Sequence, residues 1–238
     1  MIDVLSYLDE RKDEFERHMS IARLLEERVN EPVADEGIQV EVRHVNTLKS
    51  GLLIHLYNIV EALATRTLKV VGQTVVNDRP RLWTEMVLKE WVRAEVWSGE
   101  ERIGDGALTR LTDVSAALVS GSSPGEFAVK GTPGGWDDKA IKEVAKRLGC
   151  TLALTPRIRR AAYQKAYRDE DTAMVFLRKR RNAIAHGSST FEDGANLLTL
   201  DEIEGLADRV LPYLRAVSES YQAFLVNKNY LKEEETVQ

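Results

Sequence analysis

The sequence predicts a mostly all-α protein, a bundle of long antiparallel helices interrupted by one loop-rich insertion. Three observations predict this fold class. Apolar residues recur at helical spacing along most of the chain. The expected helices begin and end at residues typical of helix termini. Glycine and proline gather in residues 99–135, where we expect loops with at most a short hairpin.

The N-terminal third predicts three helices. In residues 3–29, apolar residues recur at seven-residue steps between charged ones, which is typical of a long amphipathic helix. The apolar members of this series are Leu8, Phe15, Ala22 and Val29. Residues 42–71 have so apolar a centre that this helix must be buried on most sides. A third helix is expected over residues 80–97, with Pro80 in its first turn.

The rest of the chain predicts shorter helices and one long final helix. Inside the insertion we expect a short helix at residues 108–118 and allow for a strand at residues 126–130. Further helices are expected at residues 137–148, 156–168, 172–186 and 199–225. Gly149 closes the first of these, and Thr199 with Glu202 forms a capping box for the last. Residues 1–238 are expected to form a single domain, with residues 228–238 as a mobile polar tail.

Composition limits the class of protein. Hydrophobic residues make up 43% of the chain and charged residues 30%, as in ordinary globular proteins. The net charge of −5 argues against nucleic-acid binding over the whole surface but permits a local basic patch. The single cysteine, Cys150, fits a reducing compartment, and no run of transmembrane length occurs. The start also lacks the features of a signal peptide, so we expect a cytoplasmic protein without a membrane contact.

The most specific chemical signal is the segment Arg178-Lys179-Arg180-Arg181-Asn182-Ala183-Ile184-Ala185-His186-Gly187. Its end offers an arginine, an amide and an imidazole on the last turns of one helix. Arg181 and His186 point about 140° apart with a rise of about 7.5 Å. Asn182 shares the face of His186. One copy supplies only one proton carrier, one planar cation and one amide. Two copies facing each other across a twofold axis would make a complete site.

These groups suit RNA cleavage without a metal ion. Histidine moves protons near neutral pH, and the arginine fork stabilises the charge that develops on a phosphate. Attack by the ribose 2′-oxygen would make DNA resistant. The alternative is a structural one, in which the cations offset the helix dipole and His186 is a partly exposed cap.

A second polar group lies in the apolar helix. His55, Asn58, Glu61 and Thr65 fall within about 120° of one another on a helical projection. A buried carboxylate needs a cation or a proton. We therefore expect Glu61 to pair with Arg181 or a neighbouring arginine, with Asn58 as a second supporting residue. The alternatives are a purely structural ion pair or a polar stripe that faces water.

The basic character extends beyond the motif. Residues 157–181 carry nine cations against three carboxylates. The candidate RNA-binding residues are Arg157, Arg159, Arg160, Arg178, Lys179 and Arg180. Tyr163 and Tyr167, four residues apart, would stack on bases if they share a helix face. They would alternatively fill the core.

No metal ion or cofactor is expected. The histidines and the cysteine lack zinc spacing. The glycines match neither a P-loop nor a dinucleotide fingerprint, and no Gly-x-Ser-x-Gly elbow occurs.

An all-helical chain with Arg-Asn-x-x-x-His at the end of a late helix resembles the HEPN nuclease superfamily. Arg181, Asn182 and His186 match its Arg-x4-6-His motif, and residues 56–61 look like its early core helix. The segment at residues 134–149 is similar to HEPN-like nucleases found near restriction and toxin genes. The resemblance covers residues 42–97 and 156–225.

This resemblance implies a helical-bundle domain that dimerises and builds a composite, metal-free ribonuclease site from two motifs. It also implies a role as a toxin or anti-phage effector, held by a separate antitoxin or defence partner protein. Two alternatives stay open: a non-catalytic RNA-binding or protein-interaction module, and a structural subunit of a larger complex.

Overall fold

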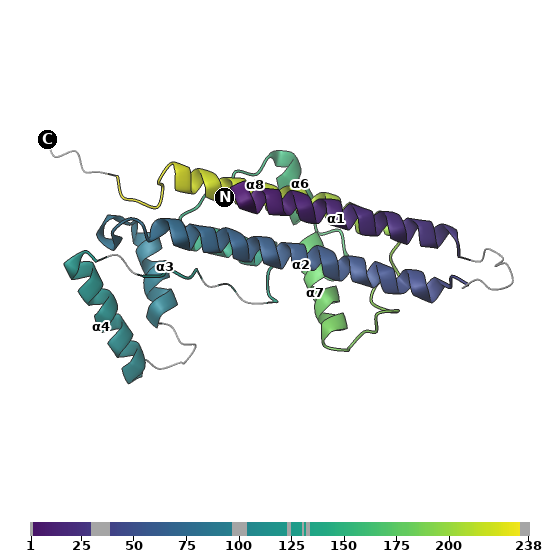
Figure 1. The fold of residues 1–238 in the computed structure, drawn as a ribbon, viewed down its shortest axis with the longest axis horizontal. Coiled ribbons are helices and arrows are strands. Elements are labelled where there is room, and N and C mark those ends of the chain that lie inside the picture. The colour runs from purple at the N-terminus through teal and green to yellow at the C-terminus, as the bar shows by residue number, and fades with distance from the viewer. Residues whose placement is uncertain are drawn as a thin grey trace.

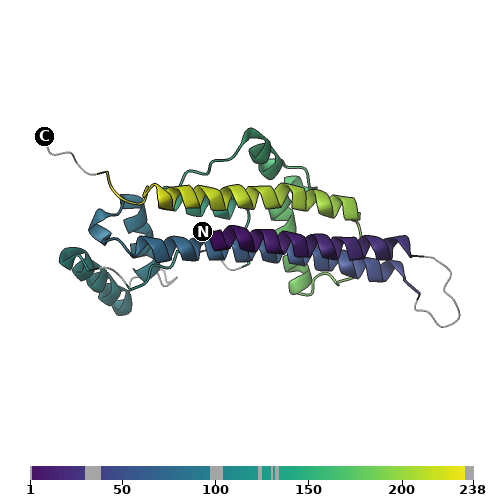
Figure 2. The same ribbon diagram turned by 45° about the horizontal axis from the view of Figure 1, so that its top comes forward.

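Three long helices form the frame of the molecule: α1 (Ile2–Glu27), α2 (Val42–Val75) and α8 (Leu200–Val226). The computed structural model describes residues 2–29, 39–96, 104–122, 125–129, 131 and 134–233. The three helices lie side by side, and α1 runs opposite to α2 and α8 (Figures 1 and 2). Within the described residues there are eight α-helices, two single-turn 3-10 helices and no strand. The prediction of an all-α bundle is therefore confirmed.

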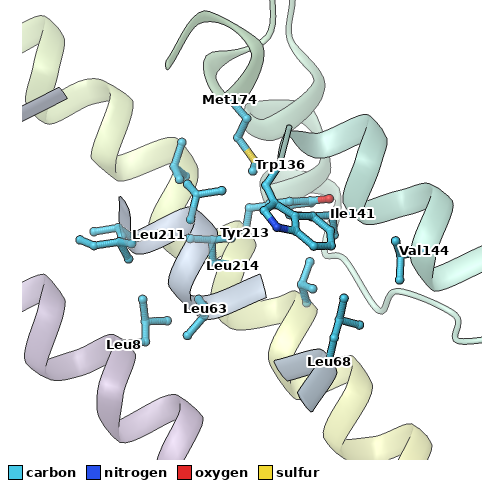
Figure 3. Close-up of a cluster of buried hydrophobic side chains, with 14 of the residues drawn as sticks. Leu8, Leu63, Leu68, Trp136, Ile141, Val144, Met174, Leu211, Tyr213 and Leu214 are labelled. Carbon is cyan, nitrogen blue, oxygen red and sulfur yellow. The ribbon is translucent and has the colours of Figure 1, made fainter. Parts of the chain in front are cut away.

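The core lies where these helices meet the shorter ones. The heptad positions Leu8, Phe15 and Ala22 of α1 are buried, as their spacing predicted. The apolar centre of α2 is buried on most sides, again as predicted. Figure 3 shows side chains of α1, α2, α5, α7 and α8 gathered around Trp136, which is itself buried.

The third helix starts later than predicted. Pro80 opens the 3-10 turn η1 (Pro80–Leu82), and α3 spans Glu85–Val96. Between them Trp83 is extended and fully buried, and its indole N–H donates to the backbone oxygen of Asp78 at 3.1 Å. Because this anchor needs an extended backbone, one helix cannot run through it. The end of the expected helix, Trp97, lies outside the described residues.

The insertion contains a longer helix than expected and no strand in its described part. Helix α4 spans Asp105–Ser120. Residues 126–129 form no ladder. Instead, Phe127 is buried and stacks on Trp83, and its carbonyl lies against Gly72 of α2. The described residues of the segment for which a strand was allowed are therefore irregular and anchored by Phe127. Lys130 lies outside the described residues.

The last helices begin at capping side chains, of which the cap at Thr199 was predicted. Asp137, Thr155, Thr172 and Thr199 each accept a hydrogen bond from a first-turn backbone N–H. They open α5 (Asp138–Leu148), α6 (Pro156–Tyr163), α7 (Ala173–Ala185) and α8. Such caps satisfy backbone donors that the helix itself leaves free.

Helix α6 ends at Tyr163, five residues before the predicted end. The chain then passes through a 3-10 turn, η2 (Arg168–Glu170), before α7. Tyr163 meets Tyr213 edge-on, and Tyr167 stacks on Phe176. The expectation that both tyrosines share one helix face is wrong; both rings are partly buried against the core, in line with the alternative.

The described part of the expected tail packs back on the bundle. Tyr230 is buried and donates from its hydroxyl to Oδ2 of Asp78 at 2.7 Å. Leu231 forms an isolated bridge with Trp83. Residues 234–238 lie outside the described residues. No described helix combines the length and apolar character needed to cross a membrane.

Candidate functional site

Helix α7 carries the Arg-Asn-x-x-x-His motif and is fixed along its length. Thr172 caps its start, and the buried Met174 and Leu177 pack it into the core. The last turn ends at Ala185, with His186 as the C-cap and Gly187 in the left-handed region at φ 73°. This packing turns Arg181 toward α2, while the C-terminal end of the helix is exposed to solvent.

Arg181 is held by three groups. Its Nη2 donates to Oε2 of Glu61 at 3.0 Å, and its Nη1 donates to Oδ1 of Asn182 at 3.0 Å. Its guanidinium carbon lies 4.9 Å from the ring centroid of Tyr57, within cation–π range. The side chains of Arg181 and Glu61 are 24% and 26% exposed. The expected contact between Glu61 and Arg181 is thus present, and the guanidinium is still accessible to a ligand.

Sequence reasoning missed two parts of this arrangement, Tyr57 and Gly134. The backbone N–H of Gly134 donates to Oε1 of Glu61 at 2.9 Å, so both carboxylate oxygens are engaged. Burial, followed by the charge of Glu61, raises the pKa of Tyr57 and keeps the ring neutral. The signal for Tyr57 was its position one turn before Glu61 on α2. Gly134 lies in a distant loop and gave no such signal.

His186 stands apart from Arg181. Its side chain is exposed at the end of α7, while Arg181 faces α2. Its backbone N–H closes the helix by donating to the oxygen of Asn182 at 2.9 Å. A single copy therefore presents a fixed guanidinium and an exposed imidazole on different sides of one helix.

Asn58 is exposed on α2. The structure shows no hydrogen bond from its amide to Arg181, Asn182 or Glu61. Asn58 therefore makes no hydrogen bond to these motif residues or to Glu61.

The basic run is largely neutralised by local carboxylates. Arg178 lies 3.1 Å from Oδ2 of Asp137, and Lys179 lies 2.8 Å from Oδ2 of Asp171. Arg180 forms no ion pair with any described residue; its guanidinium lies 5.3 Å from the ring centroid of Phe176. The run is therefore not a continuous stripe of unpaired cations. In contrast, Arg157, Arg159 and Arg160 are all exposed on α6.

Two further observations concern metal and thiol chemistry. Among the residues that the structure describes, no three His, Cys, Asp or Glu side chains gather as a metal-ligand set. Burial raises the pKa of Cys150 to about 12, so this thiol stays protonated.

Comparison with known families agrees with the all-helical fold. The family model described as HEPN_MAE_28990-like HEPN matches residues 3–230. Searches of curated proteins and of solved structures each found no match. The match spans α1 to the end of α8, including the segments at residues 104–136. The chain therefore belongs to the HEPN_MAE_28990-like HEPN family.

Proposed function

We propose that this protein is a metal-independent endoribonuclease that acts as a homodimer, as a toxin or anti-phage effector. One observation carries the proposal. The motif arginine is fixed by Glu61, Asn182 and Tyr57 but is still accessible, and an exposed histidine ends the same helix. Family membership supports a nuclease or an RNA-binding module.

The reaction needs a proton carrier and a cation near one phosphate. A base removes the proton of the ribose 2′-hydroxyl, and the 2′-oxygen bonds to phosphorus. The bond from phosphorus to the 5′-oxygen breaks, and an acid protonates the leaving oxygen. The products are a 2′,3′-cyclic phosphate and a 5′-hydroxyl. Histidine can serve in either proton transfer, because its pKa lies close to neutral pH.

Each group of the motif has a role in this reaction. The N–H groups of Arg181 that are not used by Glu61 and Asn182 would hold the non-bridging phosphate oxygens. Asn182 positions the guanidinium, and His186 carries the proton. Because Arg181 and His186 of one copy diverge, we propose that the phosphate lies between two copies related by a twofold axis.

Cleavage in EDTA tests this function. Purified protein is incubated with labelled RNA and with DNA of the same sequence. The wild type should cut RNA to products with 2′,3′-cyclic phosphate ends and leave DNA intact. His186→Ala should lose at least about 100-fold in rate, a typical effect of losing a proton-transfer group. Intact RNA with the wild type, or equal cleavage by His186→Ala, would refute the proposal.

Arg181→Lys adds a sharper control. Lysine keeps the charge but cannot donate from separate nitrogens to Glu61 and Asn182 while also facing a phosphate. Its rate should fall about 100-fold, in the range known for loss of a transition-state donor. Its melting temperature should stay close to that of the wild type, because the pair with Glu61 is partly exposed.

The second candidate is a non-catalytic RNA-binding or protein-interaction module in a defence complex. The carboxylate partners of Arg178, Lys179 and Arg181 favour its protein-interaction form, because cations that are already paired bind phosphates less strongly. RNA binding that is unchanged in His186→Ala, without cleavage by the wild type, would establish this alternative.

A further inference from the structure

A groove runs along α8, first between α8 and α6 and then between α8 and α7. Its first part is lined by Arg157, Arg160, Gln164 and Asp208. Its second part is lined by Tyr167, Phe176, Arg180, Leu198 and Glu202. Gly205 and Arg209 of α8 line both parts, so the two hollows adjoin at these residues.

The groove collects cations that lack carboxylate partners. Within the described part of the chain, Arg157, Arg160 and Arg180 form no ion pair, and Arg209 donates only to the neutral Oε1 of Gln164 at 2.9 Å. Two carboxylates also line the groove. Glu202 and Asp208 supply two negative charges against the four arginines. The groove is therefore positive on a chain whose net charge is −5.

The shape of the groove also suits an extended chain. Its middle is formed by Gly205, where an added Cβ would meet no atom within 4 Å. Arginine forks match the oxygens of successive phosphates, and the apolar side chains beside them can contact ribose. Arg180 is adjacent to Arg181 in sequence, so the groove reaches the motif helix.

We propose that this groove binds the sugar–phosphate backbone of single-stranded RNA, with Arg209 at its centre. This inference rests on RNA as the substrate of the proposed function. The proposed RNA path excludes Arg178 and Lys179, which have carboxylate partners. It includes the groove residues Arg157, Arg160, Arg180 and Arg209. Arg209, on the last helix, had no place in the sequence-based candidate set.

Binding without cleavage tests the groove. The probe is a fluorescently labelled single-stranded RNA with every 2′-hydroxyl methylated, so that cleavage cannot occur. Its anisotropy is measured in EDTA over a series of salt concentrations. Each lost phosphate contact should make the slope of log K against log salt about 0.7 less negative, which is about 5-fold in affinity at about 0.1 M salt. Arg209→Gln should show this change, and Arg157→Gln/Arg160→Gln/Arg209→Gln should lose about 100-fold.

Matched variants test whether RNA binding depends on the groove arginines or only on the total charge of the protein. Arg17→Gln removes an exposed cation of α1, which forms no ion pair with described residues, and should bind like the wild type. Arg159 lies on α6 but lines a different hollow with Lys142 and Lys146, so Arg159→Gln should lose less than Arg209→Gln. Asp208→Asn should bind more tightly. Gln164→Ala keeps the cation and removes its hydrogen bond, so it should keep the salt slope of the wild type.

The outcomes distinguish this inference from the proposed nuclease. The groove proposal is overturned if the wild type does not bind the probe, if Arg209→Gln keeps the wild-type slope, or if Arg17→Gln loses as much. Wild-type protein that binds through the groove but never cleaves unmodified RNA overturns the nuclease and leaves the groove. Cleavage with an unaffected Arg209→Gln variant overturns the groove alone.

Discussion

The guanidinium of Arg181 is positioned before any ligand arrives. Glu61 and Asn182 fix two of its nitrogens, and Tyr57 lies against its face. Glu61 is itself fixed, because its second oxygen accepts the N–H of Gly134. A cation held in this way needs little reorganisation when charge develops on a phosphate.

Gly134→Ala tests whether the loop end supports the arginine. Gly134 has φ 69°, which is unfavourable for alanine, and the added Cβ would lie 3.1 Å from Nη1 of Arg181. We expect a loss of about 1 to 3 kcal/mol in the free energy of unfolding, measured by urea denaturation. RNA cleavage should fall more than stability alone explains, because the guanidinium must shift.

Gly125→Ala is the matched control for this substitution. Gly125 has an ordinary φ, and an added Cβ would meet no atom within 4 Å. Its stability and cleavage should stay near those of the wild type. If Gly134→Ala also had the stability and the cleavage rate of the wild type, the contact between the loop and the motif would contribute to neither.

At the level of single residues, the sequence predicted the contact between Glu61 and Arg181, because an acidic residue in an apolar helix requires a partner. It did not predict that Arg178 and Lys179 would pair with Asp137 and Asp171. Counting charges along a segment gives a local total but not which side chains meet. Those pairs depend on how α5 and η2 pack beside α7.

At the level of elements, helix starts were predicted well where a capping residue marks them. Thr199 caps α8 as predicted, whereas Thr172, predicted as the first residue of its helix, instead caps α7. Prediction failed where tertiary packing overrides local preference. The buried Trp83 delays α3, and the chain leaves α6 at Tyr163 so that Tyr167 can stack on Phe176.

A buried acid joins α5 to the start of α7. Asp138 accepts the hydroxyl of Thr172 at 2.5 Å, and the same hydroxyl caps α7. Burial raises the pKa of Asp138 above its usual 3.8, although Thr172 opposes the shift; Asp137 adds to it and Arg178 opposes it. The folded state therefore binds the proton more tightly than the unfolded state does. This group stabilises the fold at low pH, and its contribution is lost as pH rises from 3.8 through the raised value.

Asp138→Asn should remove this dependence, because asparagine can still accept the hydroxyl of Thr172 without a charge. The free energy of unfolding is measured in urea from about pH 4 to about pH 7 for both proteins. The variant should gain stability relative to the wild type as pH rises, and the difference should then become constant. A difference that is constant over the whole range, or that grows in favour of the wild type, would contradict this account.

At the level of the whole molecule, the charge distribution favours local over general binding of nucleic acid. The chain is acidic overall, yet Arg157, Arg160, Arg180 and Arg209 line one groove. The family match extends over residues 3–230 and so includes both the groove and the motif. The groove contacts α7 at Phe176 and Arg180, and His186 is exposed at the C-terminal end of the same helix.

The dimer is the last requirement of the proposed mechanism. Arg181 faces α2 and His186 is exposed at the helix end, and the proposed mechanism therefore takes the two groups at one phosphate from two copies. We expect a solution mass of twice the 26.8 kDa of the chain by light scattering, and a specific activity that rises with protein concentration. Wild-type chains are then mixed, under conditions that allow exchange, with increasing amounts of Arg181→Lys/His186→Ala chains over a large excess of RNA.

If each site pairs Arg181 of one copy with His186 of the other, a mixed dimer has no complete site, so the doubly substituted chains should suppress the activity per wild-type chain as mixed dimers replace wild-type dimers. An equal amount of an unrelated protein should leave that activity unchanged. If each chain instead acts alone, activity per wild-type chain would stay constant at every ratio. That result would rule out a composite site and would require Arg181 and His186 of one copy to reach the same phosphate.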